Sequence, residues 1–317
     1  MKLPYEEFDL SGIKTYPLGS RPSKVGRAQF ATPFTPGSGI GGWLMSLPSL
    51  LGASDFKAVV AAIVAAKRAG RPIIWGFGAH VLKTGLSPVL VDLMARGYVS
   101  AIATNGAGVI HDFEIALAGA TSEDVDATLG PGTFGMAEET GARINAAIVS
   151  GVANGLGLGQ SVGRFLNEAQ VPFAQISVTA TAYRLGIPMT VHVAIGTDII
   201  HMHPQASGAA IGEASLRDFK YFVTCVSELE GGVYLNCGSA VVLPEVFLKA
   251  VAISKNEGRS LANLTTVNLD FLRHYRPQTN VVTRPTAGSG KGYSLTGHHE
   301  LLIPLLAAAL IETESAA

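Results

Sequence analysis

Residues 99–113 read Val-Ser-Ala-Ile-Ala-Thr-Asn-Gly-Ala-Gly-Val-Ile-His-Asp-Phe, and this stretch decides the fold class that the sequence predicts. Val99 to Thr104 is apolar or small enough for a short buried strand, and Asn105-Gly106-Ala107-Gly108 is typical of a tight turn. Val109 to Ala118 then has the apolar spacing of a helix. A strand that leads through a glycine turn into a helix is half of a βαβ unit, so the stretch predicts a parallel sheet.

The same alternation occurs along most of the chain. Further strands are expected at residues 73–77, 173–179, 189–195, 232–236 and 264–269. Further helices are expected at residues 55–69, 86–96, 218–228, 246–253 and 301–311, the third of them starting at a capping box of Ser215 and Asp218. Apolar strands that alternate with helices indicate an α/β protein with a doubly wound, Rossmann-like parallel sheet and helices on both faces.

The two ends of the chain differ in composition. Residues 1–43 contain five prolines and little periodicity, so we expect an extended N-terminal arm that wraps the domain or a neighbouring subunit. Residues 44–317 are expected to form a single α/β nucleotide-binding domain.

Composition restricts the partners of the protein. Hydrophobic residues make up 48% of the chain and charged residues 15%, which predicts that part of the surface is hidden in a homo-oligomer. A net charge of −1 argues against nucleic acid and against an anionic membrane surface, since both select basic proteins. Two cysteines and an N-terminus without the apolar core of a signal peptide predict a cytoplasmic protein. The longest apolar run, Leu301 to Ile311, is too short to span a bilayer.

Four loops are expected at the carboxyl ends of the strands, where open parallel sheets bind their ligands. They are residues 76–85, 104–108, 196–198 and 237–240. Small residues beside a helix start favour a phosphate there, although a tight turn requires glycine in any case. None of the loops matches the dinucleotide fingerprint or a P-loop. Taken together they favour a nucleotide-type ligand, with Asn105, Gly196 and Thr197 among its contacts.

A second group of chemically active residues lies near the C-terminus. Residues 284–293, Arg-Pro-Thr-Ala-Gly-Ser-Gly-Lys-Gly-Tyr, place Lys291 between glycines, and His298-His299-Glu300 follows closely. Lysine and histidine are often recruited as nucleophile and proton carrier. We therefore expect an active-site loop with Lys291, His298, His299 and Glu300 as catalytic residues, although a solvent-exposed Lys291 is the alternative.

The histidines also allow a metal interpretation. His192, His201 and His203 surround the loop at Gly196, and with Asp198, His298 and Glu300 they supply enough ligands for a metal ion. Their spacing matches no standard zinc motif, so acid/base or phosphate-binding roles are favoured and no metal is assigned.

The residues resemble those of the deoxyhypusine synthase family. Val99 to Phe113 is similar to a strand, turn and helix segment of that family, and Lys83-Thr84-Gly85-Leu86 resembles a segment just upstream of it. Further resemblances occur at residues 188–203, 232–242 and 284–306. The resemblance implies a doubly wound NAD-binding fold, a homotetramer with active sites across subunit interfaces, and NAD as cofactor. In that family NAD oxidises a polyamine, and an active-site lysine, matched here by Lys291, takes up the aminobutyl group.

The resemblance also implies which residues lie near the cofactor. They are Thr84, Gly85, Thr104, Gly106, Gly108, Asp112, Asp198, Gly238 and Ser239. Ile110 and His111 replace two acidic residues of the family, Leu243-Pro244-Glu245 replaces its histidine pair, and the tryptophan before the lysine is absent.

We therefore predict an NAD-dependent transferase or oxidoreductase that differs from deoxyhypusine synthase. It is expected to oxidise an amine or small polar metabolite, with group transfer through Lys291 as a further step. The alternatives are a non-catalytic nucleotide-binding protein and a metal-dependent hydrolase.

Overall fold

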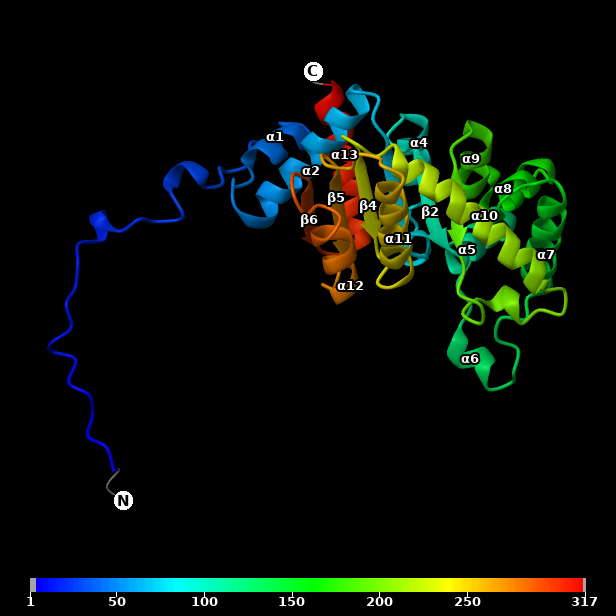
Figure 1. Cartoon of the computed structure of the whole chain (residues 1–317), viewed down its shortest axis with the longest axis horizontal. Coiled ribbons are helices and arrows are strands. Elements are labelled where there is room, and N and C mark those ends of the chain that lie inside the picture. The colour runs from blue at the N-terminus through cyan, green and yellow to red at the C-terminus, as the bar shows by residue number, and fades with distance from the viewer. Residues whose placement is uncertain (1–3, 316–317) are drawn as a thin grey trace.

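Six parallel strands form one sheet in the order β3-β2-β1-β4-β5-β6 in the computed structural model, which describes residues 4–315 (Figure 1). The strands are β1 (Ile73–Phe77), β2 (Ala101–Asn105), β3 (Met189–His192), β4 (Val233–Cys237), β5 (Thr265–Asp270) and β6 (Lys291–Thr296). The chain runs outward from β1 to β3 and then returns to β4 on the other side of β1. This order confirms the predicted doubly wound, Rossmann-like α/β class, and it creates a switch point between β1 and β4.

Helices cover both faces of the sheet, because alternate strand residues are apolar on each side. Ile74 and Tyr234 pack with Phe222 of α10 (Gly208–Ser227) and Phe247 of α11 (Val242–Asn256). Trp75 belongs to the cluster on the other face, with side chains of α2 (Leu51–Arg68), α4 (Ser87–Ala95) and α13 (His299–Ser315). The helices are α1 (Gly39–Ser46), α2 (Leu51–Arg68), α3 (His80–Lys83), α4 (Ser87–Ala95), α5 (Gly106–Ala118), α6 (Val125–Leu129), α7 (Glu138–Ala153), α8 (Leu158–Glu168), α9 (Val178–Leu185), α10 (Gly208–Ser227), α11 (Val242–Asn256), α12 (Tyr275–Pro277) and α13 (His299–Ser315). Within residues 4–315, no helix combines the length and apolar content that crossing a membrane requires.

The strand predicted at residues 173–179 is wrong. Residues 174–176 form a short 3-10 helix, and α9 begins at Val178. The hydroxyl of Ser177 accepts a hydrogen bond from the backbone N–H of Ala180, and the Asp112 carboxylate accepts from the N–H groups of Val178 and Thr179. These acceptors satisfy the first N–H groups of a helix, which outweighs the strand preference of the apolar residues.

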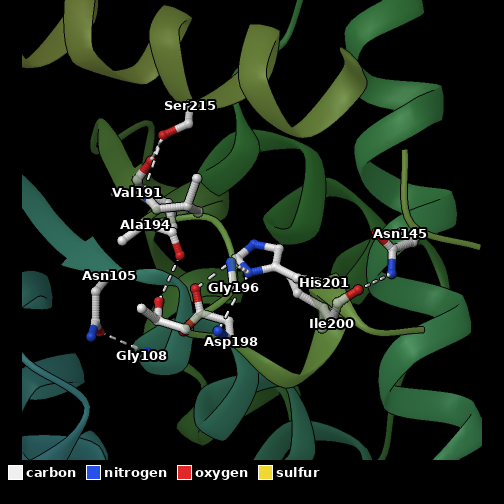
Figure 2. Close-up of polar contacts among 12 residues, drawn as sticks. Asn105, Gly108, Asn145, Val191, Ala194, Gly196, Asp198, Ile200, His201 and Ser215 are labelled. Carbon is white, nitrogen blue, oxygen red and sulfur yellow. Dashed lines mark hydrogen bonds and ion pairs between the residues drawn. The ribbon is translucent and has the colours of Figure 1, made fainter. Parts of the chain in front are cut away.

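The start predicted for the helix at residues 218–228 is also wrong. Helix α10 begins at Gly208 after the N-cap Ser207, so Ser215 lies in its interior. The Ser215 hydroxyl donates to the carbonyl of Val191 and accepts from the N–H of Val193, which covers the outer edge of β3 (Figure 2). Ser215 therefore protects a sheet edge and is not a cap.

The C-terminal active-site loop is shorter than predicted, because β6 starts at Lys291 and pairs with β5 from Thr265 onward. The first part of the N-terminal arm is extended and projects away from the domain (Figure 1), whereas Gln29 and Thr32 hydrogen-bond with Ser49 and Ser46. Residues 1–3 of the predicted arm lie outside the described part of the chain. Helix α1 follows the arm and packs against α13.

Candidate active site

The turns after β1 and β4 meet at the switch point of the sheet. Gly78 follows β1 and donates its N–H to the carbonyl of Cys237, while Gly238 follows β4 and donates to the carbonyl of Leu269. A Cβ atom on Gly78 would lie 2.4 Å from the Gly238 carbonyl oxygen, so only glycine allows this approach. Gly238 adopts a left-handed conformation with φ +66°. The two turns therefore meet where sheets of this topology bind their ligands, the place between the carboxyl ends of β1 and β4 that is called the switch-point crevice.

His299 lies directly beside this crevice, at the start of α13. Its Nε2 atom is 3.1 Å from the carbonyl oxygen of Leu269, and its ring is fully buried. A carbonyl only accepts, so Nε2 carries the hydrogen and Nδ1 keeps a lone pair. Nδ1 has no hydrogen-bond partner among the described residues. Burial lowers the pKa of His299, so the ring is neutral at pH 7 and presents an unoccupied acceptor.

Aromatic rings from three strand ends surround His299. Its ring centroid lies 5.5 Å from that of His80, which follows β1, and 6.1 Å from that of Phe271, which follows β5. The exposed ring of His298 stacks on Phe271 at 6.4 Å, and its Nδ1 lies 3.7 Å from the Glu300 carboxylate. The structure therefore brings together His298, His299 and Glu300 of the predicted catalytic residues.

Lys291 does not join this group. It is exposed at the amino end of β6, whereas His298 follows the carboxyl end of the same strand. Six strand residues span roughly 20 Å. Within one protomer, Lys291 and His299 therefore lie near opposite ends of β6, separated by most of the length of that strand.

Asp198 occupies the N-terminus of α5, where the sequence predicted a phosphate. A Cβ atom on Gly106 would lie 2.1 Å from Oδ2 of Asp198, and this oxygen is buried without a hydrogen-bond partner among the described residues. Burial raises the pKa of Asp198, and His201 and the N–H of Ala107 lower it in part. A carboxylate that fills a helix N-terminus takes the place of an anionic ligand.

His201 holds the loop that carries Asp198. Its Nδ1 accepts from the N–H groups of Gly196 at 3.2 Å and of Asp198 at 3.3 Å (Figure 2). Thr197 donates its hydroxyl to the carbonyl of Ala194 within the same turn. Nε2 of His201 therefore carries the hydrogen and lies 3.9 Å from Oδ2 of Asp198. Gly196 and Thr197 remain exposed at the carboxyl end of β3.

Other side chains predicted at the cofactor have internal partners. Asn105 caps α5 by accepting from the N–H of Gly108, and Thr104 donates to the carbonyl of Phe77. The carboxylate of Asp112 is fully buried and holds Ser177 and the start of α9. Each of these side chains positions the backbone of a strand end or helix start.

The remaining predicted contacts flank the crevice. Thr84 donates its hydroxyl to the carbonyls of His80 and Val81, and Gly85 is exposed with φ +80°. Ser239 accepts from the N–H of Leu243 and so starts α11. Cys237 is fully buried and burial raises the pKa of its thiol, which makes it unreactive.

The two histidine groups do not converge on one point. His192 ends β3, and His201 and His203 follow it, whereas His298 and His299 follow β6 at the opposite edge of the sheet. Across residues 4–315, no three His, Cys, Asp or Glu side chains lie close enough to share a metal ion.

The sequence predictions did not include Phe271 or Asp270 in the site, and they included His80 only as part of the loop at residues 76–85. Asp270 ends β5 and is buried, with Oδ1 accepting from the N–H of Phe271. All three follow or end predicted strands, so the rule that ligands bind at carboxyl ends pointed to them. Their side-chain chemistry alone gave no signal.

No family model matches the chain, and no curated protein matches its sequence. Solved structures do match. AgrE in ternary complex with ornithine and NAD+ gives a TM-score of 0.54 at 16% identity over 83% of this chain and 33% of AgrE. A conserved putative LOR/SDH protein from Methanococcus maripaludis S2 gives 0.52 at 19% identity over 82% of this chain and 70% of that one. A putative deoxyhypusine synthase from Entamoeba histolytica gives 0.50 at 13% identity over 89% and 96%.

These likenesses define the fold. The chain has the fold of the deoxyhypusine synthase-like NAD-binding proteins, and the resemblance of its sequence to deoxyhypusine synthase is confirmed as a likeness of fold. It spans about a third of the length of AgrE.

Proposed function

We propose that this protein is an NAD-dependent enzyme that oxidises an amine or another small polar metabolite at the carboxyl edge of its sheet. The buried His299 carries the proposal, because it combines an oriented ring with an unpartnered Nδ1 beside the switch-point crevice. A buried acceptor without a partner costs roughly 1–3 kcal/mol, and such groups concentrate at functional sites.

The turns after β1 and β4 fit a dinucleotide. Gly78 and Gly238 let the two turns pack against each other and against His299, so that backbone forms this part of the switch point, and Ser239 and Phe271 follow the neighbouring strand ends. When bound, NAD supplies a hydride acceptor. The N-terminus of α5 does not fit the phosphates, because the Asp198 carboxylate already lies there.

His299 is the proposed proton acceptor. Oxidation of an amine removes a hydride from carbon and a proton from nitrogen, so the site needs a base. The hydrogen bond from Nε2 to Leu269 fixes the tautomer that leaves Nδ1 free to take this proton. The lowered pKa keeps the ring in its basic form at pH 7. The exposed His298 and Glu300 pair offers a route for the proton to solvent.

The complex of AgrE with ornithine and NAD+ supports the proposal, because part of AgrE shares the fold of this chain. Group transfer through Lys291 is left out, because Lys291 lies at the amino end of β6.

Titration calorimetry with NAD+ tests the cofactor. We expect Gly238→Ala to weaken NAD+ binding at least about tenfold, because the new Cβ would lie 2.7 Å from Cε1 of His299 and must move that ring. Gly258→Ala is the matched control, since Gly258 has a similar φ of +78° with open space around it. Absence of binding to the wild-type protein at millimolar NAD+ overturns the proposal.

NADH formation from a panel of primary amines and amino acids tests the reaction. We expect His299→Gln to lower kcat about 100-fold or more, the usual contribution of a general base, while NAD+ affinity stays near that of the wild type. His274→Gln, outside the ring cluster, serves as the control for histidine replacement. Tight NAD+ binding without turnover of any amine supports the non-catalytic alternative.

A further inference from the structure

A second cavity lies far from the proposed active site, beside the outer edge strand β3. It has a volume of about 480 Å³ and lies among α8, α9, α10 and the segment from Gly186 to Thr190 that leads into β3. The lining segment from Gly186 to Thr190 leads into the amino end of β3, whereas the switch-point crevice lies at the carboxyl ends of β1 and β4, two and three strands away across the sheet. A ligand in this cavity cannot share the switch-point crevice.

The floor of the cavity carries two buried polar side chains. Thr179 is 1% exposed, and its Oγ1 has no hydrogen-bond partner among the described residues. Asp218 is 2% exposed, and its Oδ2 accepts from the N–H groups of Gly159 at 3.0 Å and Val191 at 2.8 Å. A buried hydroxyl without a close hydrogen-bond partner is costly, and the nearest acceptor within the protein is the Asp112 carboxylate, whose pKa the Thr179 side chain helps to lower.

The mouth of the cavity carries two tyrosines. Tyr183 lies one turn after Thr179 on α9, and Tyr221 lies one turn after Asp218 on α10. Residues three or four apart share a helix face, so each helix presents a buried polar group below an aromatic ring. The two tyrosines are 38% and 49% exposed, respectively, which leaves their rings open to a ligand.

The charge that the cavity wall can supply at neutral pH is negative. Asp218 is the only acidic or basic residue among those that line it within the described chain. The neighbouring Arg217 donates to the carbonyl of Leu156 and to the Glu213 carboxylate, and it does not line the cavity. Burial raises the pKa of Asp218 to about 7, and the N–H groups of Gly159, Val191 and Leu158 and the charge of Arg217 lower it only in part. A buried carboxylate without a paired cation favours a positively charged ligand, which would stabilise its ionised form.

We infer that this cavity is a second binding site, one that takes an organic cation such as a primary ammonium or guanidinium group. The two tyrosine rings hold the cation at the mouth, Asp218 supplies the opposite charge, and Thr179 adds a hydrogen bond. The site is independent of the proposed NAD chemistry, because the two share no residue.

Calorimetry with agmatine and n-butylammonium, with 1-butanol as the neutral analogue, tests the inference. Both cations are expected to bind and 1-butanol is not. Tyr221→Leu should weaken agmatine binding about fivefold, because it removes the aromatic face, whereas Tyr221→Phe keeps the face and should stay within about twofold of the wild type. Tyr221 is half-exposed, so both variants should fold.

Two further results separate this site from the proposed active site. Agmatine binding should persist unchanged in Gly238→Ala and should weaken in Thr179→Val. No agmatine binding at millimolar concentration, equal binding by Tyr221→Leu and wild type, or loss of binding in Gly238→Ala overturns the inference. If NAD+ does not bind but agmatine binds as expected, the proposed function fails and the inference of a second binding site still holds.

Discussion

The carboxylate of Asp198 lies against Gly106, so closely that a Cβ atom at position 106 would approach Oδ2 to 2.1 Å. This contact joins the loop after β3 to the first turn of α5. The contact between Asp198 and Gly106 explains why the turn after β2 requires glycine, without a bound phosphate. The chain supplies its own anion to the helix N-terminus.

Gly106→Ala should therefore destabilise the protein. The added methyl must displace Asp198 from the helix N-terminus, and we expect a loss of roughly 1–3 kcal/mol in unfolding free energy, as for overpacked cores. Urea denaturation measures it. Gly212→Ala is the control, because Gly212 lies inside α10 with open space around it and should gain about 0.5–1 kcal/mol. Equal free energies of unfolding for Gly106→Ala and Gly212→Ala would contradict the close contact between Asp198 and Gly106.

Stability should fall in acid partly because of His192. Burial lowers the pKa of His192 from 6.5 to about 3, so between these values the unfolded chain binds a proton that the folded protein excludes. The free energy of unfolding then decreases as the pH falls from 6.5 toward 3, by up to about 1.4 kcal/mol per pH unit.

Replacement of that histidine isolates its contribution. His192→Gln should unfold in urea with a weaker dependence on pH below 6.5 than the wild type, and with a parallel dependence above pH 7. Both proteins share the other titrating groups, so the difference between the two curves reports His192. Parallel curves throughout would show that His192 does not titrate as described.

Lys291→Ala should leave function in place. The side chain is exposed at the amino end of β6, so we expect NAD+ affinity and turnover within about twofold of the wild type and little change in thermal midpoint. Titration calorimetry measures the NAD+ affinity, NADH formation measures the turnover, and thermal denaturation measures the midpoint. A large loss of turnover with unchanged NAD+ binding would instead assign Lys291 to a site completed by another copy of the chain.

Removal of the N-terminal arm should reduce the size of the assembly. Nine large apolar side chains of the arm are 51–86% exposed, namely Tyr5, Phe8, Leu10, Ile13, Tyr16, Leu18, Val25, Phe30 and Phe34. So many exposed apolar side chains indicate that another protein surface packs against them, and we expect that surface to belong to a second copy of the chain. We expect light scattering to give a multiple of 32.9 kDa for the full chain and a smaller species after deletion of residues 1–36. A full-length monomer would contradict this prediction.

Strongly periodic segments could be predicted from the sequence, and segments governed by distant partners could not. Ile73–Phe77 and Val233–Cys237 are mostly apolar on both faces, as in buried parallel strands. The first lies at its predicted place, and the second lies within one residue of its predicted place. Residues 173–179 have a similar apolar content but lead into a helix start. The Asp112 carboxylate, 65 residues earlier than Ser177, accepts hydrogen bonds from the Ser177 hydroxyl and from the N–H groups of Val178 and Thr179. No local pattern contains that partner.

The candidate site likewise has features that the local sequence predicts and features that depend on contacts between distant segments. The sequence by itself determined that small residues end the strands and that histidines lie near the C-terminus, since turns and side-chain chemistry are local properties. Only the tertiary structure decided that His299 rather than Lys291 lies beside the crevice, because β6 turned a predicted loop into a strand and placed the two at its opposite ends. It also placed Asp198 on Gly106 and Thr179 beside Asp218, since contacts between segments far apart in the chain depend on how the helices pack around the sheet.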